Sequence, residues 1–273
     1  MSQSSSVKTD IPASAWPEWR YFDEVNALLG KIISAAKDAK SSRVGALYPL
    51  LDSIEESVSS LRTLARMQAL RDSYVISRVI YETSINACFL LTSPVELTNR
   101  ANVHAKQKAL RSLVRRIEIA GSPLFEFKAI GTDEILQDPK HKELLAEFTS
   151  KSGREITSWT SENVQQRLEA IYQTFGSEAS KGLAFGLLLY RHASEIAHGT
   201  LYGTLFSWGA MDLGRSLKSP EDLAIFRRAE LRHVLKLISF TLESLVHVCA
   251  QALALQPLAA LATKARLDYY ESR

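Results

Sequence analysis

The chain has 273 residues, of which 46% are hydrophobic and 23% are charged, a balance that excludes a long disordered protein and a fibrous repeat. Its 12 glycines and 8 prolines are few for this length, which argues against a fold of many short strands joined by tight turns. The formal net charge of +3 is too small to predict nucleic-acid or membrane binding through bulk attraction.

The first residues, 1–20, are polar and rich in serine, and we expect them to form a tail in front of a single helical domain over 21–273. No apolar run at this end would serve as a signal peptide, and no later apolar stretch is predicted to span a bilayer. Cys88 and Cys249 lie in apolar stretches without metal-ligand spacing, so neither a disulfide nor a zinc site is expected. These features predict a cytoplasmic protein with no metal, no cofactor and no membrane partner.

Four helices are predicted in the first part of the chain. Apolar residues recur every three or four positions over 21–39 and again over 44–67, which is the period of amphipathic helices. The next segment, 68–91, is apolar on nearly all sides and is therefore expected in the core. A fourth helix is predicted to start after Ser93 and to run to Ala120.

The predicted fourth helix carries a run of basic residues with little acidic relief. Those that we consider for RNA binding are Lys106, Lys108, Arg111, Arg115 and Arg116. A solvated helix face is the structural interpretation of this run, and an RNA-binding patch is the functional alternative. The stretch 121–160 is the least regular part of the sequence, and we expect an insertion there with a short helix at 140–149.

The last part of the chain is again helical in pattern. Helices are predicted over 161–175, over 181–199, over 219–255 and over 257–271. The glycines of 200–214 are interpreted as close-packing positions, with a mobile lid as the alternative. No run with the two-residue period of a strand is recognised, so the predicted fold class is all-α, a multi-helix bundle of long antiparallel helices.

The polar end of the predicted helix 181–199 is the main candidate site, because the sequence has none of the common dinucleotide, P-loop, serine-hydrolase or zinc motifs. At 100° per residue, Arg191, Glu195 and His198 fall within about 60° of one another. Ser194 lies beside them. An ionisable group in an apolar helix is costly unless it is paired or functional, so this stripe needs an explanation.

The stretch RHASEIAH, in which His198 follows Arg191 by seven positions, resembles the Rx4-6H motif of the HEPN superfamily. The order of RVIYE and then YRHASEIAHG also resembles a bacterial all-helical family known only as a domain of unknown function. The HEPN resemblance implies a metal-independent RNA endonuclease, typically a homodimer with facing motifs, that acts as a toxin or effector in bacterial anti-phage defence. It also implies an associated partner protein of such a system.

The resemblance assigns roles to the residues of the stripe. His198 would be the general base or acid for attack of a ribose 2′-OH on the adjacent phosphate, and Arg191 would stabilise charge on the phosphorane. The supporting residues would be Tyr190, His192, Ser194 and Glu195, together with Arg78 and Glu82 from the helix predicted over 68–91. Arg228 and His233, with four residues between them, also satisfy the motif, and Arg227 does so with the same His at a longer spacing, but the sequence around them predicts a charged helix face.

A structural interpretation of the stripe stays open. Arg78 and Glu82 are four residues apart in an apolar helix, so they are placed to form an internal ion pair and to hydrogen-bond with Tyr190, Ser194 or His198. A third interpretation is a small-molecule or nucleotide pocket without catalysis. The alternative function is then a non-catalytic, helical partner-binding or sensor protein. Solvent exposure of Arg191 and His198 favours the nuclease, whereas burial against Arg78 and Glu82 favours the structural network.

Overall fold

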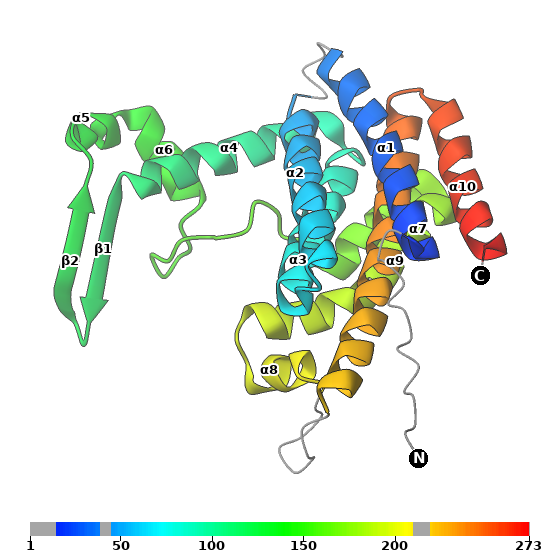
Figure 1. Cartoon of the computed structure of the whole chain (residues 1–273). Helices are drawn as coiled ribbons and strands as arrows, with labels where there is room; N and C mark the ends of the chain where they lie inside the picture. Colours follow the sequence, from blue (N-terminus) through cyan, green and yellow to red (C-terminus); the bar gives the residue numbers. More distant parts are fainter. Residues whose placement is uncertain (1–14, 39–44, 210–218, 273) are drawn as a thin grey trace. The chain divides into compact units, whose positions relative to one another are not determined.

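The computed structural model describes residues 15–38, 45–209 and 219–272, and most of these residues are helical (Figure 1). The described residues form ten helices and one two-stranded sheet, so the predicted all-α fold is confirmed. The chain divides into a main unit, Met1–Thr92 with Val164–Arg273, and an inserted unit, Ser93–Asn163. The irregular insertion expected at 121–160 is thus part of a larger unit.

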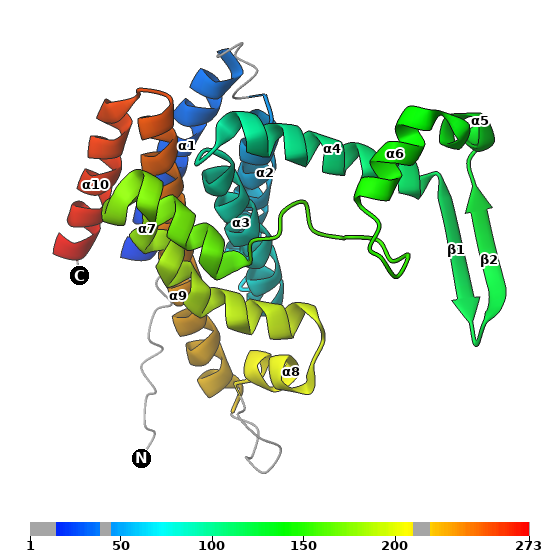
Figure 2. The ribbon, with the colours of Figure 1, turned by 180° about the vertical axis from the view of Figure 1, so that it is seen from behind.

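The helices of the main unit pack around α9. Their bounds are α1 Pro17–Asp38, α2 Leu47–Arg66, α3 Leu70–Leu90, α7 Val164–Ala197, α8 Leu201–Ser207, α9 Pro220–Ala252 and α10 Gln256–Glu271. Helix α9 contacts α1, α3, α7 and α10, and α3 also contacts α2 and α7. The view from behind shows α7 crossing α9 (Figure 2).

Helix α9 is the core helix of the main unit. Nearly every residue from Leu231 to Ala250 is buried. This helix is long and apolar enough to qualify as a membrane span by length and composition, but 89% of the apolar window is buried inside the protein. Ser219 caps its start by accepting a hydrogen bond from Asp222 N at 3.2 Å, and Pro220 occupies the first turn, as the sequence predicts.

The first helix of the main unit begins earlier in the chain than predicted. Helix α1 begins at Pro17, before the expected start at Tyr21, and the side chains of Trp16 and Trp19 are buried. The rest of the predicted tail, 1–14, lies outside the described residues, as does 210–218 at the end of the glycine-containing segment 200–214.

Two glycines bring the backbone of α7 close to its neighbours. A Cβ atom at Gly182 would lie 1.8 Å from the Phe240 carbonyl oxygen of α9, and one at Gly186 would lie 2.2 Å from Cε2 of Tyr81 on α3. Two hydrogen bonds follow from this approach: Gly182 N donates to Ser244 Oγ at 2.9 Å, and Tyr81 OH donates to Leu183 O at 3.0 Å. Only glycine fits at these two positions without rearrangement.

A third glycine, Gly176, bends α7. Its φ of 82° and ψ of 179° lie outside the helical region and are accessible almost only to glycine. The predicted helices 161–175 and 181–199 therefore correspond to the two arms of one bent helix.

Buried charged groups join α1, α9 and α10. Glu243 on α9 is 4% exposed. It accepts a hydrogen bond from Tyr21 OH and lies 3.4 Å from Nε of Arg266 and 3.5 Å from Nε2 of His247. Burial, together with the neighbouring Glu243 carboxylate, raises the pKa of Tyr21. His247 is itself buried, and these contacts show why α9 tolerates a carboxylate in its buried part.

The inserted unit contains the clearest departure from the sequence predictions. Its elements are α4 Pro94–Ser112, β1 Val114–Ile119, β2 Ser122–Lys128, α5 Thr132–Gln137 and α6 Pro139–Glu147. The fourth helix therefore ends at Ser112, and its predicted extension to Ala120 is wrong. Helix α6 corresponds to the short helix predicted at 140–149.

An antiparallel hairpin takes the place of that extension, so the prediction that the chain has no strand is also wrong. Ile117–Glu118–Ile119 and Phe125–Glu126–Phe127 alternate apolar and charged residues, and β-branched and aromatic residues favour strands. Between them, Ala120 and Gly121 have φ values of 50° and 78°, the signs that a tight hairpin turn requires. This alternation was not recognised because the run of basic residues before it was assigned to a helix that continued to Ala120.

Substitution of Gly182 tests the close approach of α7 to α9. Gly182→Ala is expected to lower the free energy of unfolding by about 1–3 kcal/mol, because the added methyl group overpacks a buried contact. The matched control is Gly30→Ala in α1, where nothing lies within 4 Å of the added Cβ. It is expected to raise stability by about 0.5–1 kcal/mol through helix propensity. Equal effects in urea unfolding would contradict the assigned contact.

Candidate functional site

The polar end of α7 lies against α3 and is followed directly by the turn into α8. Helix α7 ends at Ala197, and Gly199 adopts a positive φ of 64°, which is typical of a helix C-terminus. His198 N donates to Ser194 O at 3.0 Å, so His198 still belongs to the last turn. The predicted stripe is therefore presented at the end of a helix.

His198 is exposed and contacts Arg78 of α3. Arg78 Nη1 lies 3.4 Å from His198 Nε2, and Arg78 Nε donates to Glu82 Oε1 at 3.1 Å. The guanidinium also lies 5.4 Å from the centre of the Tyr190 ring, within the range of a cation–π interaction. The pKa of Tyr190 is raised, mainly by partial burial of the phenol and to a smaller extent by the nearby Glu82 carboxylate. The structure thus brings together Arg78, Glu82, Tyr190 and His198.

Arg191 is exposed on α7, the helix that precedes His198, and its surroundings differ from those of Arg78. Among the described residues its side chain forms neither an ion pair nor a hydrogen bond. The arginine in contact with His198 is therefore Arg78, which comes from another helix. Exposure of both Arg191 and His198 matches what a nuclease site needs, while the Arg78 contact matches part of the structural network.

Glu195 and Ser194 do not orient His198 through their side chains. The Glu195 carboxylate accepts a hydrogen bond from Thr200 Oγ1 at 2.8 Å, across the turn between α7 and α8. Thr200 in turn caps α8 by accepting from Gly203 N at 3.1 Å. For Ser194, the described contact is through its backbone carbonyl, which accepts from His198 N. These residues hold the turn that follows His198.

His192 faces α8. Its Nδ1 lies 3.0 Å from Tyr202 OH, and its ring stacks on Phe206 with a centroid separation of 4.7 Å. His233 on α9 belongs to the same neighbourhood. Partial burial lowers the pKa of His233, and Lys236 and His192 lower it further, while the Glu230 carboxylate opposes this shift. From the sequence, the segment 200–214 that contains Tyr202 was interpreted only as close-packing positions or a lid, and His192 was not connected with His233. This neighbourhood depends on the packing of α7, α8 and α9, which no local pattern encodes.

The residues considered for RNA binding all lie in the inserted unit, and the expected single helical face is wrong because two of the five lie on β1. Lys108 pairs with Glu155, and Arg116 pairs with Glu118 at 2.8 Å. Arg111 donates to two backbone carbonyls and to Thr149, so it fastens α4 to α6. Lys106 and Arg115 are exposed and have no ion-pair partner among the residues that the structure describes.

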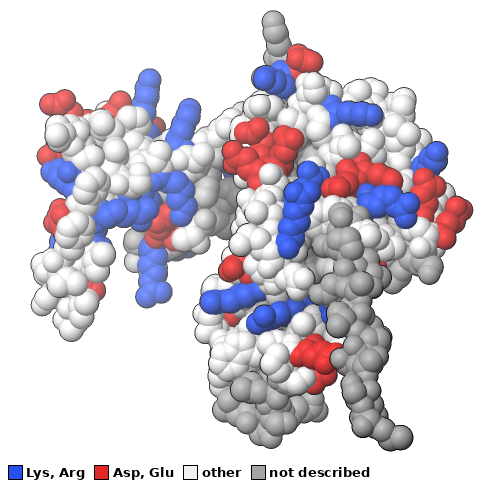
Figure 3. All heavy atoms as spheres, in the orientation of Figure 1, with Lys and Arg blue, Asp and Glu red and all other residues white. Residues whose placement is uncertain are grey.

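Basic residues also line a pocket of the inserted unit. This pocket has a volume of about 360 Å³ and is lined by Arg111, Arg115 and Arg116 together with apolar residues and Glu155. Figure 3 shows Lys and Arg side chains close to Asp and Glu side chains over much of the surface in view (Figure 3). The basic groups are therefore partly neutralised by neighbouring carboxylates.

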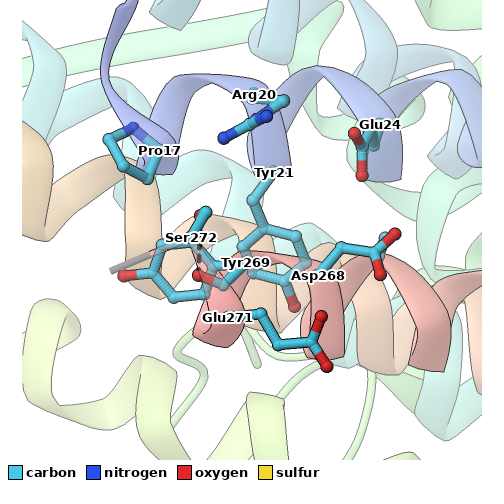
Figure 4. Close-up of a pocket in the computed structure, with 9 residues that line it drawn as sticks. Pro17, Arg20, Tyr21, Glu24, Asp268, Tyr269, Glu271 and Ser272 are labelled. Carbon is cyan, nitrogen blue, oxygen red and sulfur yellow. Dashed lines mark hydrogen bonds between the residues drawn. The ribbon is translucent and has the colours of Figure 1, made fainter.

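A pocket of about 370 Å³ is lined by residues of α1 and α10 and by none of the residues of the polar end of α7. Figure 4 shows Arg20 and Glu24 above it and Asp268 and Glu271 below, with the Tyr21 and Tyr269 rings between them (Figure 4). The two rings stack with their centres 5.1 Å apart. None of its lining residues was predicted as part of the site.

Within the described residues, no group of three or more His, Cys, Asp or Glu side chains is placed to hold a metal ion.

Comparison with known proteins gives a family but no function. The family model for a family of unknown function, DUF5677, matches residues 46–212, which is more than half of the chain. The match includes the inserted unit and the whole polar end of α7. It agrees with the resemblance to a family of unknown function. No curated protein and no solved structure matches the chain.

The two arginines near His198 are expected to differ in their contribution to stability. Arg78→Ala should lower the free energy of unfolding by about 1 kcal/mol, because it removes the Glu82 ion pair and the contact with the Tyr190 ring. Arg191→Ala should change it by less than about 0.5 kcal/mol, as is usual at an exposed position without partners. Urea unfolding of both variants measures the difference, and a larger loss for Arg191→Ala would contradict the described contacts.

Proposed function

We propose that this chain, which belongs to the DUF5677 family of unknown function, is a HEPN-like, metal-independent RNA endonuclease that acts in the cytoplasm as a toxin or effector of bacterial anti-phage defence. The observation that carries the proposal is the exposed imidazole of His198, which lies 3.4 Å from the guanidinium of Arg78 on α3. Helix α7, which precedes His198, also exposes the guanidinium of Arg191. Two cations and one imidazole at a surface suit a substrate with a phosphodiester.

The contact between Arg78 and His198 suggests how the imidazole acts. A guanidinium has donors only, so Nε2 of a neutral His198 accepts and Nδ1 carries the proton. When a substrate phosphate binds Arg78, Nε2 is released and becomes free to take the proton from a ribose 2′-OH. The 2′ oxygen then attacks the neighbouring phosphorus, and the bond to the 5′ oxygen breaks.

Arg191 has a separate role in this proposal. Its guanidinium is not committed to a carboxylate among the described residues, and a planar guanidinium binds two phosphate oxygens at once. It therefore stabilises the charge that develops on the phosphorane. The 5′ oxygen takes its proton from water or from an imidazole.

The proposal includes a homodimer in which the polar ends of α7 face each other. The exposed side of α7 next to Arg191 is apolar: Phe185 is 49% exposed and Leu188 is 61% exposed. Leu201, just beyond His198, is also 61% exposed. Large apolar side chains that are exposed together favour a protein interface. A second copy seated there would bring two sets of basic groups to one RNA strand.

A non-catalytic partner-binding or sensor protein is the second candidate function. It is favoured by the contacts of Arg78 with Glu82, Tyr190 and His198, which are those of a structural network. In that case the apolar face of α7 would bind a different protein of the same defence or toxin system. The two candidates differ in whether Arg191 and His198 matter to RNA.

RNA cleavage in EDTA tests the nuclease. Purified protein is expected to cut single-stranded RNA, and both Arg191→Ala and His198→Ala are expected to reduce the rate by at least about 100-fold, the usual contribution of a general acid–base group or of a fixed cation. Arg154→Ala, an exposed arginine of the inserted unit, serves as the matched control and should cut at the normal rate. Thermal unfolding checks that each variant is folded.

Two results would contradict the nuclease proposal. One is cleavage that persists in both folded variants, which would point to a contaminating enzyme. The other is that the wild-type protein, shown to be folded by thermal unfolding, cleaves none of several RNA sequences. The second result would favour the partner-binding candidate.

A further inference from the structure

The hairpin formed by β1 and β2 has one apolar and one charged face. The strand register and the alternation of side chains assign to the apolar face Ile117, Ile119, Phe125 and Phe127, with Arg115 opposite Phe127 at one end of this face. They assign to the charged face Arg116, Glu118, Glu126 and Lys128. An amphipathic hairpin of this kind normally covers a core with its apolar face.

The apolar face of this hairpin is exposed. Ile117 is 53% exposed, Ile119 is 62% exposed and Phe125 is 55% exposed, and no residue of 115–128 is buried. The part of the surface that the hairpin forms in Figure 3 is mostly uncharged. A two-stranded hairpin alone is only marginally stable in water, and a further strand stabilises it. The hairpin is therefore suited to receive a strand.

The outer edge of β1 carries the backbone groups that could pair with such a strand. Ala129 N donates to Leu113 O at 2.9 Å. Because bonded and non-bonded pairs alternate in an antiparallel ladder, the backbone groups of Ile117 point toward β2, whereas those of Arg116 and Glu118 point outward. The sheet has no third strand among the described residues. The outer edge of β2 is poorer, since Pro123 lacks an N–H group.

We propose that a second copy of this chain pairs antiparallel with the outer edge of β1, about a two-fold axis that passes through Ile117. A register that sets Arg116 opposite Arg116 of the second copy places like charges side by side. A register centred on Glu118 does the same with carboxylates. The register centred on Ile117 sets Arg116 opposite Glu118 twice, and opposite charges across strands are favourable. Charge thus selects one register, and it is self-complementary.

This pairing makes a four-stranded sheet from two hairpins. The two Ile117 residues form a non-hydrogen-bonded pair, in which the Cα atoms approach to about 4.5 Å. Arg116 and Glu118 already form an ion pair at 2.8 Å within one copy, so their side chains lie on the same face and need only exchange partners. The apolar faces of the two hairpins become continuous. The interface is isologous, and it is proposed in addition to the interface at the polar end of α7.

Cysteine crosslinking tests the pairing directly. In Ile117→Cys the two thiols would lie at the distance of a disulfide across the axis, whereas both native cysteines, Cys88 and Cys249, are buried. Mild oxidation is expected to give a disulfide-linked dimer. Glu126→Cys, on the other strand, is the matched control and should crosslink much more slowly at the same protein concentration.

Charge substitutions in the Ile117→Cys background test the register. Arg116→Glu and Glu118→Arg should each reduce the crosslinked fraction about tenfold, because each places like charges opposite one another in two pairs. The double variant Arg116→Glu with Glu118→Arg should restore it, and so should an equal mixture of the two single variants. Lys151→Glu, an exposed site in the same unit, controls for net charge.

The result that would overturn the proposal is equal crosslinking of Ile117→Cys and Glu126→Cys. A crosslinked fraction that does not recover in the double variant and the mixture would also overturn it. Circular dichroism confirms that each variant is folded, and these exposed positions should not affect folding. The readout is a bond between two copies and involves no RNA, so it is independent of the proposed nuclease function.

Discussion

The close approach of the α7 backbone to α9 and α3 is the constraint on which the main unit depends. At Gly182 and at Gly186 there is no room for a Cβ atom. The two glycines are four residues apart, so both lie on the side of α7 that faces the core. Helix α7 is thereby held along α3 at a fixed distance, and the residues that follow Gly186 emerge where α3 presents Arg78 and Glu82.

The polar contacts at that end are too weak to set the geometry by themselves. The ion pair of Arg78 with Glu82 and its contacts with Tyr190 and His198 are partly exposed, and such interactions each contribute less than about 1 kcal/mol. Tight packing beneath them fixes where His198 stands. The Arg191 side chain takes no part in this packing, so its substitution can change function without changing the fold.

The long helices of the main unit could be predicted because each buries a face with the period of a helix, and the start of α9 carries its signal in Ser219 and Pro220. The short helix α8, Leu201–Ser207, was not predicted, since the glycines of 200–214 were interpreted as close-packing positions or a lid. The hairpin was missed because its strands are short and exposed, so no buried face enforces an alternating pattern. In the site, the angular rule placed Arg191 and His198 on one side of α7. The nearest cation to His198 comes from α3, and that contact depends on tertiary packing that no local pattern encodes.

The coupling between Gly186 and Tyr81 is the most direct test of this account. Gly186→Ala should cost about 1–3 kcal/mol of stability, because the methyl group meets the Tyr81 ring. In a Tyr81→Leu background, where the ring is gone, most of that cost should disappear, whereas in a Tyr81→Phe background it should persist. Urea unfolding of these variants gives the coupling energy. Additive effects in the Tyr81→Leu background would contradict the close approach of α7 to α3.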